Sequence, residues 1–132
     1  MNYIDLIALL AVGQLVFFAV LVGRARIRYG VKAPAVSGHE MFERAYRVQM
    51  NTLELMVAFL PALFIAAKYW PQNYVAGVGV VYLVGRFIYW RSYVGAPASR
   101  APGFILSMIP VMVLIVGGLA GIILQPGSGL DH

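Results

Sequence analysis

Two apolar stretches near the ends of the chain restrict its possible folds more than any other feature. The first, residues 3–23, holds one charged residue, Asp5, at its outer end, and the last, residues 104–124, holds none. Each is about 21 residues long, enough for a helix to cross the roughly 30 Å hydrocarbon core of a bilayer. The sequence therefore predicts an integral membrane protein.

The composition agrees with a membrane location. Hydrophobic residues make up 61% of the 132 residues and charged residues 11%, against about 45–50% and about 25% in soluble domains. Such a chain is too hydrophobic for intrinsic disorder. Cysteine is absent, which excludes disulfides, zinc–thiolate sites and a cysteine nucleophile, and we expect no bound metal. Any thiol chemistry then needs a thiol from a small molecule.

Two further hydrophobic stretches lie in the middle of the chain. Residues 52–67 are too few to span a bilayer unless the polar stretch 42–51 continues the same helix, whereas 74–93 is long enough alone. We therefore predict one all-α domain over residues 1–132, a bundle of four transmembrane helices. Their expected limits are 3–23, 42–69, 74–93 and 104–124.

The positive charges indicate how the bundle is oriented. Nine of the ten cations surround the first and third predicted connections, and only Lys68 lies near the second. Because cations concentrate on the cytoplasmic side, we expect a bacterial inner-membrane protein with both termini in the periplasm. The net charge of +5 then reflects membrane orientation, and we expect no nucleic-acid partner. The nine cations are Arg24, Arg26, Arg28, Lys32, Arg44, Arg47, Arg86, Arg91 and Arg100.

A row of polar side chains follows the second predicted helix. Arg44, Arg47, Asn51 and Glu54 are 3, 4 and 3 residues apart, so they share one helix face. Glu54 lies in the apolar stretch, where an unpaired carboxylate costs roughly 2.5–3.5 kcal/mol, and Arg47 and Asn51 are its nearest candidate partners. The row is either a ligand site or a structural network of ion pairs. Pairs four residues apart suit the structural interpretation, namely Glu40–Arg44 and Glu43–Arg47.

A second polar row lies on the third predicted helix, where Tyr82, Arg86, Tyr89 and Tyr93 are 4, 3 and 4 residues apart. Tyrosines near a membrane surface commonly anchor a helix at the interface. Four polar-tipped residues in register, ending at a basic loop, also suit a ligand site. Arg100, seven residues beyond Tyr93, either reaches back over the end of the bundle or faces lipid phosphates.

The residue types in the two rows indicate the chemistry of a ligand. Several arginines favour an anion with carboxylates, which a guanidinium binds through two hydrogen bonds. The lone carboxylate of Glu54 favours an ammonium group, and phenols and amides suit a peptide backbone. The residues alone therefore predict an anionic, amino-acid-like ligand at the cytoplasmic face of the membrane.

Two segments of the chain resemble a known family. Residues 42–54, FERAYRVQMNTLE, resemble the signature of the MAPEG family, the membrane-associated proteins of eicosanoid and glutathione metabolism, and residues 81–93, VYLVGRFIYWRSY, resemble its third helix. The resemblance covers nearly the whole chain. It is closest to the branch of microsomal glutathione transferase 2, the leukotriene-forming glutathione conjugase and the 5-lipoxygenase-activating protein. It implies a homotrimer with glutathione held between subunits near the cytoplasmic side.

The resemblance also implies roles for individual residues. Arg100 matches the catalytic arginine beside the thiol, and Gln49 and Arg26 match contacts from the adjacent subunit. The sequence departs from the family pattern at Leu55, where tyrosine is common, and at Val57, where proline is expected. The implied glutathione-binding residues are Arg26, Arg47, Gln49, Asn51, Glu54, Tyr89 and Tyr93.

The activity implied by the resemblance is that of a membrane glutathione S-transferase in detoxification. Such an enzyme holds glutathione as a thiolate and conjugates it to lipophilic electrophiles from the bilayer, or uses it to reduce lipid hydroperoxides. One alternative is a non-catalytic lipid-binding scaffold of the same family, against which Arg100, Tyr89 and Tyr93 argue. The other is a small four-helix drug exporter, which carries a carboxylate in its first helix where this chain has Gln14.

Overall fold

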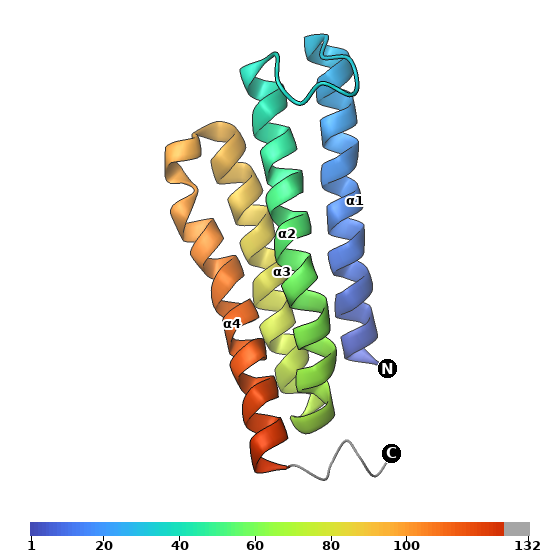
Figure 1. Cartoon of the computed structure of the whole chain (residues 1–132), viewed down its shortest axis with the longest axis vertical. Helices are drawn as coiled ribbons and strands as arrows, with labels where there is room; N and C mark the ends of the chain where they lie inside the picture. The colour runs from blue at the N-terminus through green and yellow to red at the C-terminus, as the bar shows by residue number, and fades with distance from the viewer. Residues whose placement is uncertain (126–132) are drawn as a thin grey trace.

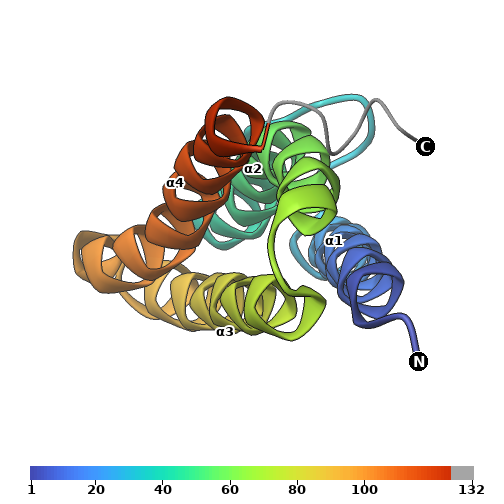
Figure 2. The same ribbon diagram turned by 90° about the horizontal axis from the view of Figure 1, so that it is seen from below.

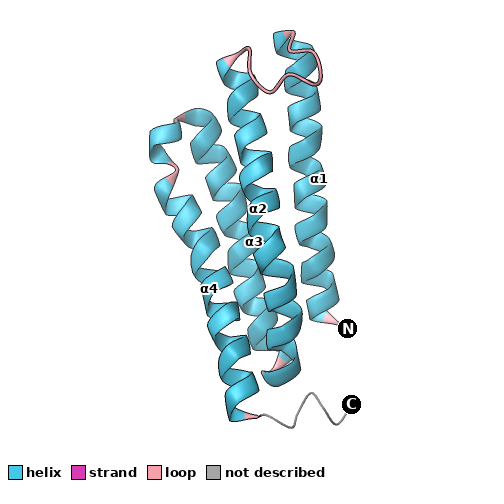
Figure 3. Cartoon of the chain, in the orientation of Figure 1, coloured by secondary structure: helices cyan, strands magenta, loops and turns pink. Residues whose placement is uncertain are grey.

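A computed structural model describes residues 1–125, which form four long α-helices and one 3-10 turn. The helices run up and down along one axis (Figure 1), and the described residues contain only helices and loops (Figure 3). The last residues of the predicted domain, 126–132, lie outside the described residues. In chain order the elements are α1 (Tyr3–Tyr29), α2 (Glu40–Tyr69), α3 (Gln72–Gly95), η1 (Pro97–Ser99) and α4 (Ala101–Leu124).

The α1–α2 loop and the η1 connection lie at the same end of the bundle, which is named the basic end here. The N-terminus, the α2–α3 turn and the end of α4 lie at the opposite end (Figure 1). The first and third connections therefore share one side of the molecule, and with them most of the lysines and arginines.

Helices α2 and α3 each pack against the three other helices, and α1 and α4 lie on opposite sides of them (Figure 2). Helix α2 is a single helix of 30 residues that includes the polar stretch 42–51. The short apolar stretch after it therefore belongs to a helix of about 45 Å, which is long enough to cross a membrane.

Helix α1 continues six residues past its predicted end at residue 23. Its chain reverses at Gly30, which has a φ of 71°, and the Val31 N–H donates to the Arg26 carbonyl at 3.1 Å. These features form a glycine C-cap of the Schellman type. The apolar stretch marked where the membrane core ends, whereas alanine and arginine, both good helix formers, carry the helix farther.

By length and composition, three segments among the described residues can cross a membrane: α1, α2 and Pro97–Leu124. Helix α3 is about 36 Å long at 1.5 Å per residue, but it is less apolar than these three segments. Arg86 and Arg91 lie in it and lower its mean hydropathy. The protein is thus an all-helical membrane protein, and the fourth span remains a prediction.

Glycines bring α3 and α4 into direct backbone contact. A Cβ added to Gly103 would lie 2.5 Å from the Tyr89 backbone nitrogen, and one added to Gly85 would lie 2.7 Å from the Ser107 nitrogen. Only glycine permits such an approach. Two other glycines of α4, Gly118 and Gly121, face α2, and a Cβ at Gly121 would lie 2.4 Å from the Tyr69 Cβ.

The interior divides into two halves along the bundle axis. The half toward the termini, named the apolar half, holds one large hydrophobic core from all four helices. The half toward the basic end, named the polar half and extending from Asn51 and Arg86 to η1, holds two small clusters around Phe18 and Phe42. The core of the apolar half comprises Ile4, Ile7, Ala8, Ala11, Leu55, Phe59, Ala62, Leu63, Ala66, Val75, Ala76, Tyr82, Val111 and Leu114.

Candidate functional site

The two polar rows meet at one buried hydrogen bond. Arg86 on α3 is fully buried, and its Nη1 donates to Oδ1 of Asn51 on α2 at 2.8 Å. Its guanidinium carbon lies 4.4 Å from the centre of the Tyr89 ring, a cation–π geometry. Arg86 therefore joins the α2 row to the tyrosines of α3.

The Tyr89 phenol lies in the electrostatic field of three arginines. Arg86, whose guanidinium lies over the Tyr89 ring, acts on it more strongly than Tyr93, Arg100 and Arg47 do. The rings of Tyr89 and Tyr93 stack with their centres 5.5 Å apart. These five residues are named the phenol cluster, and they come from α2, α3 and the residue that precedes α4. The structure thus brings together four sequence-predicted site residues and links a fifth, Asn51, through Arg86.

Backbone contacts fix the position of Arg100. It is the N-cap residue of α4 and follows η1 directly. Its side chain is exposed, and its Nη1 donates to the Pro97 carbonyl at 3.0 Å. Three residues later, Gly103 lies against the backbone of Tyr89. The separation between Arg100 and Tyr89 is therefore set by the α3–α4 packing, and the guanidinium stays open to a ligand.

Glu54 lies on the outer face of α2 and is exposed in the single chain. Neither predicted partner pairs with it, since Asn51 accepts from Arg86 and the one salt bridge among the described residues is Arg44–Glu40. The expectation that Glu54 pairs within its own helix is therefore wrong. The next residue, Leu55, points into the core of the apolar half, so the side chain that replaces the family's tyrosine packs inside the protomer.

Arg26 and Gln49 do not join the phenol cluster of the same chain. Arg26 donates from Nη1 to the Ala35 carbonyl at 2.7 Å, and its guanidinium carbon lies 4.7 Å from the centre of the Phe42 ring. Gln49 is half-buried. Within the protomer, Arg26 therefore fastens the α1–α2 loop onto the start of α2.

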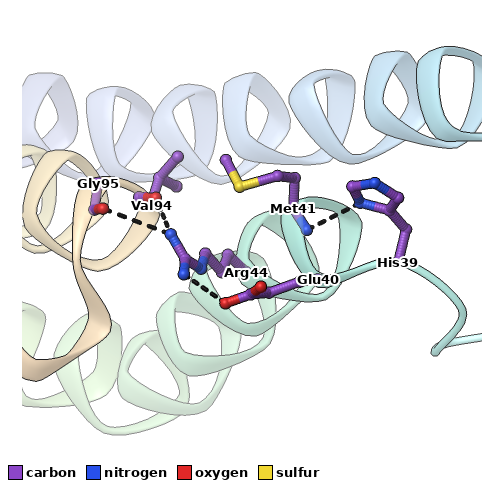
Figure 4. Close-up of polar contacts among 6 residues, drawn as sticks. All are labelled: His39, Glu40, Met41, Arg44, Val94 and Gly95. Carbon is purple, nitrogen blue, oxygen red and sulfur yellow. Dashed lines mark hydrogen bonds and ion pairs between the residues drawn. The ribbon is translucent and has the colours of Figure 1, made fainter.

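The first member of the α2 row has a structural role. Figure 4 shows Arg44 donating from Nη1 to the Val94 carbonyl at 2.8 Å, while its Nη2 pairs with Glu40. Val94 lies in the last turn of α3, whose carbonyls have no helical partner. Arg44 thus ties α2 to the C-terminus of α3, as the structural interpretation predicts for the pair Glu40–Arg44.

The second ion pair expected on α2 does not form. Glu43 accepts instead from the Gly38 N–H at 3.2 Å, which helps to hold the loop before α2. Arg47 stays exposed, and its charge acts on Tyr89. Of the two arginines, Arg44 is therefore structural, and Arg47 belongs to the candidate site.

Sequence reasoning placed Arg86 with the cations of the third connection, but it is buried inside the bundle. The signal was present in its register with Tyr82 and Tyr89, which puts it on the inner face of α3. Gln14, where an exporter would carry a carboxylate, is buried too, and its Nε2 donates to the Leu83 carbonyl of α3 at 2.9 Å. Gln14 therefore fastens α1 to α3.

The chain is similar to known proteins over most of its length. The model of the MAPEG family matches residues 4–120. An uncharacterized protein of Synechocystis is 43% identical over 91% of this chain and 88% of its own length. Human microsomal glutathione S-transferase 2 is 37% identical over 88% of this chain and 79% of its own length. Guinea-pig (Cavia porcellus) leukotriene C4 synthase is 31% identical over 89% of this chain and 78% of its own length.

The match covers all four helices and both polar rows. The family model thus matches most of the chain, and the named relatives include a glutathione transferase. With the phenol cluster inside the matched region, the chain belongs to the MAPEG family.

Proposed function

We propose that the protein is a membrane-bound glutathione S-transferase that conjugates glutathione to lipophilic electrophiles. The observation that carries this proposal is the buried Arg86, which donates to Asn51 and lies over the Tyr89 ring, within the field of the exposed Arg47 and Arg100. Cations next to hydrogen-bonding groups favour an anionic molecule. The relatives named as glutathione transferases supply the class of ligand.

The residues divide the binding of glutathione among its charged groups. Arg47 and Asn51 offer N–H donors to its carboxylates and peptide carbonyls, and Glu54 accepts from its ammonium group. Tyr89 and Tyr93 flank the reacting end. In the homotrimer, Gln49 and Arg26 of a neighbouring subunit complete the pocket.

Arg100 is the proposed catalytic residue, because it matches the family's arginine beside the thiol and its guanidinium is exposed at the basic end. A free alkyl thiol has a pKa near 8.5, so little of it is thiolate at neutral pH. A guanidinium held beside the sulfur favours the anion and lowers the pKa of the thiol. The thiolate sulfur then forms a bond to the electrophilic carbon, and the bond to the leaving group breaks as that group departs with its electron pair. Holding the two reactants side by side supplies further acceleration.

The outer face of α2 supports a homotrimer. Glu54 and Arg47 are exposed there beside Val57, whose exposed fraction is 72%. A carboxylate that faces lipid costs roughly 2.5–3.5 kcal/mol, so a second copy of the chain and a bound ligand would lower the energy of this face. The mass in mild detergent should be about three times the 14.4 kDa of the chain. A monomer with full activity would contradict the shared site.

The orientation belongs to the same proposal. The protein has four spans in a bacterial inner membrane, with the basic end and the glutathione site toward the cytoplasm and both termini in the periplasm. A cysteine introduced at exposed Lys32, in a chain without native cysteine, tests this. An impermeant maleimide should label it only after the membrane is opened.

Ultraviolet absorbance near 240 nm, where thiolates absorb, tests the activity. Glutathione added to the purified protein should produce a thiolate signal that saturates, and an aryl halide electrophile should then consume it. Binding without a thiolate signal would favour the lipid-binding scaffold. A lipid hydroperoxide as second substrate distinguishes the peroxidase reaction, in which glutathione is oxidised to its disulfide and the hydroperoxide is reduced to an alcohol.

A further inference from the structure

A groove of about 620 Å³ lies at the basic end between α1, the start of α2 and the end of α3. Its volume is within the roughly 300–1,000 Å³ of small-molecule sites. It shares no residue with the candidate glutathione site. On α2 the groove is lined by Met41 and Ala45, and Arg47 follows two residues after Ala45, about 200° around the helix. The groove is therefore a second site on another side of the bundle, named here the α1–α3 groove.

The groove lies at the level of the lipid head groups. Helix α1 has 27 residues and is about 40 Å long, whereas the hydrocarbon core is roughly 30 Å thick. Its last turns, which line the groove, therefore extend into the head-group layer. Figure 1 shows α1 and α2 continuing beyond the connection between α3 and α4. This difference in length leaves the groove open to the side.

The lining of the groove is cationic at its rim and apolar at its floor. Arg24 and Arg28 are exposed and four residues apart on one face of α1. Arg24 has no hydrogen bond or ion pair among the described residues, and Arg28 contacts only the ring of Tyr29, at 5.5 Å. Leu21 and Trp90 belong to the apolar lining, and none of the lining residues is acidic.

We propose that the α1–α3 groove binds an anionic phospholipid. Arg24 and Arg28 hold its phosphate, and one acyl chain lies along Leu21, Trp90 and Val94. A small soluble anion would leave the apolar floor uncovered, and a zwitterionic lipid would leave the cations without a net negative partner. An anionic head group joined to an acyl chain matches both parts of the groove.

Tryptophan fluorescence tests the proposal directly. The chain has two tryptophans, and Trp90 lines the groove while Trp70 follows α2 at the opposite end. In a Trp70→Phe background, the full-length protein is placed in phosphatidylcholine vesicles that contain phosphatidylglycerol. Acyl-chain bromination, which quenches nearby tryptophan, is put on one lipid or the other. Two interfacial cations predict a preference of roughly thirtyfold for brominated phosphatidylglycerol.

A matched pair of double variants separates the groove from general surface charge. Arg24→Gln with Arg28→Gln should remove the preference, whereas Lys32→Gln with Lys68→Gln removes two exposed cations that do not line the groove and should keep it. Equal quenching by both lipids in the parent, or equal loss in both double variants, would overturn the proposal. Displacement of the lipid by the electrophile of the conjugation assay would assign the groove to substrate and overturn it as well.

Discussion

The apolar and polar halves of the bundle are built from the same four helices but bury different kinds of side chain. In the apolar half, side chains such as Leu63 and Phe59 are fully buried, and the core contains almost no polar atoms. In the polar half, Arg86 is equally buried, yet Nε and Nη2 of its guanidinium have no hydrogen-bond partner. The apolar half leaves only neutral groups such as the Tyr82 hydroxyl without a partner among the described residues, whereas the polar half leaves donors of a charged guanidinium without one.

The difference indicates where stability and chemistry reside. In lipid, helices associate through close packing rather than through the hydrophobic effect, and the apolar half has the larger packed core. Unsatisfied donors cost free energy, so a protein keeps them mainly where they orient a ligand or its contacts. Substitutions in the apolar half should therefore change the free energy of unfolding. Substitutions in the polar half should change glutathione affinity or thiolate formation.

The largest effect is expected from Leu63→Ala in the apolar half. Leu63 is fully buried, so the shorter side chain leaves a cavity that costs about 2–5 kcal/mol. Unfolding in a titration with dodecyl sulfate, followed by circular dichroism, should occur at a lower detergent fraction. Leu9→Ala is the control, because Leu9 is 71% exposed on α1. A Leu63→Ala variant of normal stability with altered thiolate formation would contradict the division into halves.

Arg100→Ala should remove the thiolate and leave the fold intact. Within the described part of the chain, the exposed guanidinium donates only to the Pro97 carbonyl, so its loss should not unfold the protein. A lowering of the thiol pKa by about 2 units corresponds to about 2.7 kcal/mol. The thiolate fraction at pH 7 should fall from most of the bound thiol to a few per cent, measured as absorbance near 240 nm against pH. If Arg100 only anchors lipid phosphate, the thiolate curve of the variant will match the parent.

Glu54→Gln should weaken glutathione binding by roughly 1.5–3 kcal/mol, the range for a hydrogen bond to a charged group. The carboxylate has no ion-pair partner to lose among residues 1–125, so the stability of the chain should hold. Isothermal calorimetry with glutathione measures the change, and Glu43→Gln, on the same helix, is the control. Unchanged affinity in an intact trimer would remove Glu54 from the site.

Arg86→Met is the smallest and sharpest test. Replacing a buried cation that has no carboxylate partner with an apolar side chain of similar length is often neutral for stability. Asn51, however, loses the donor that orients it, and glutathione affinity should fall by about one hydrogen bond, roughly 0.5–1.5 kcal/mol. Arg91→Met, an exposed cation on the same helix, controls for charge. Loss of folding in Arg86→Met alone would make Arg86 structural.

The sequence alone could predict the helices and both polar rows, because hydropathy and the spacing of polar residues depend on helical geometry only. It could not predict which groups the members of each polar row contact in the folded chain. Arg44 and Arg47 have the same spacing to an upstream glutamate, yet only Arg44 forms the pair, because the C-terminus of α3 lies beside it. That choice depends on which helix is adjacent, which periodicity does not contain.

The close contact of α3 and α4 was outside sequence reasoning for the same reason. Gly85 and Gly103 are isolated glycines in their own helices, and their function appears only when the two backbones are seen together. The end of α1 was missed because hydropathy reports the membrane core, whereas the helix ends at the cap formed by Gly30.

The hydrogen bond between Arg86 and Asn51 restricts how a ligand can be oriented in the candidate site. Arginine has only donors, so the oxygen of the Asn51 amide must face Arg86, and its two N–H groups remain for a ligand. Asn51 can therefore donate to a carbonyl or a carboxylate but cannot accept from an ammonium group. An ammonium group can instead donate to Glu54, one helical turn farther along α2. A zwitterionic peptide can then lie along α2 in one sense only, with its ammonium toward the apolar half and its acceptors toward the basic end.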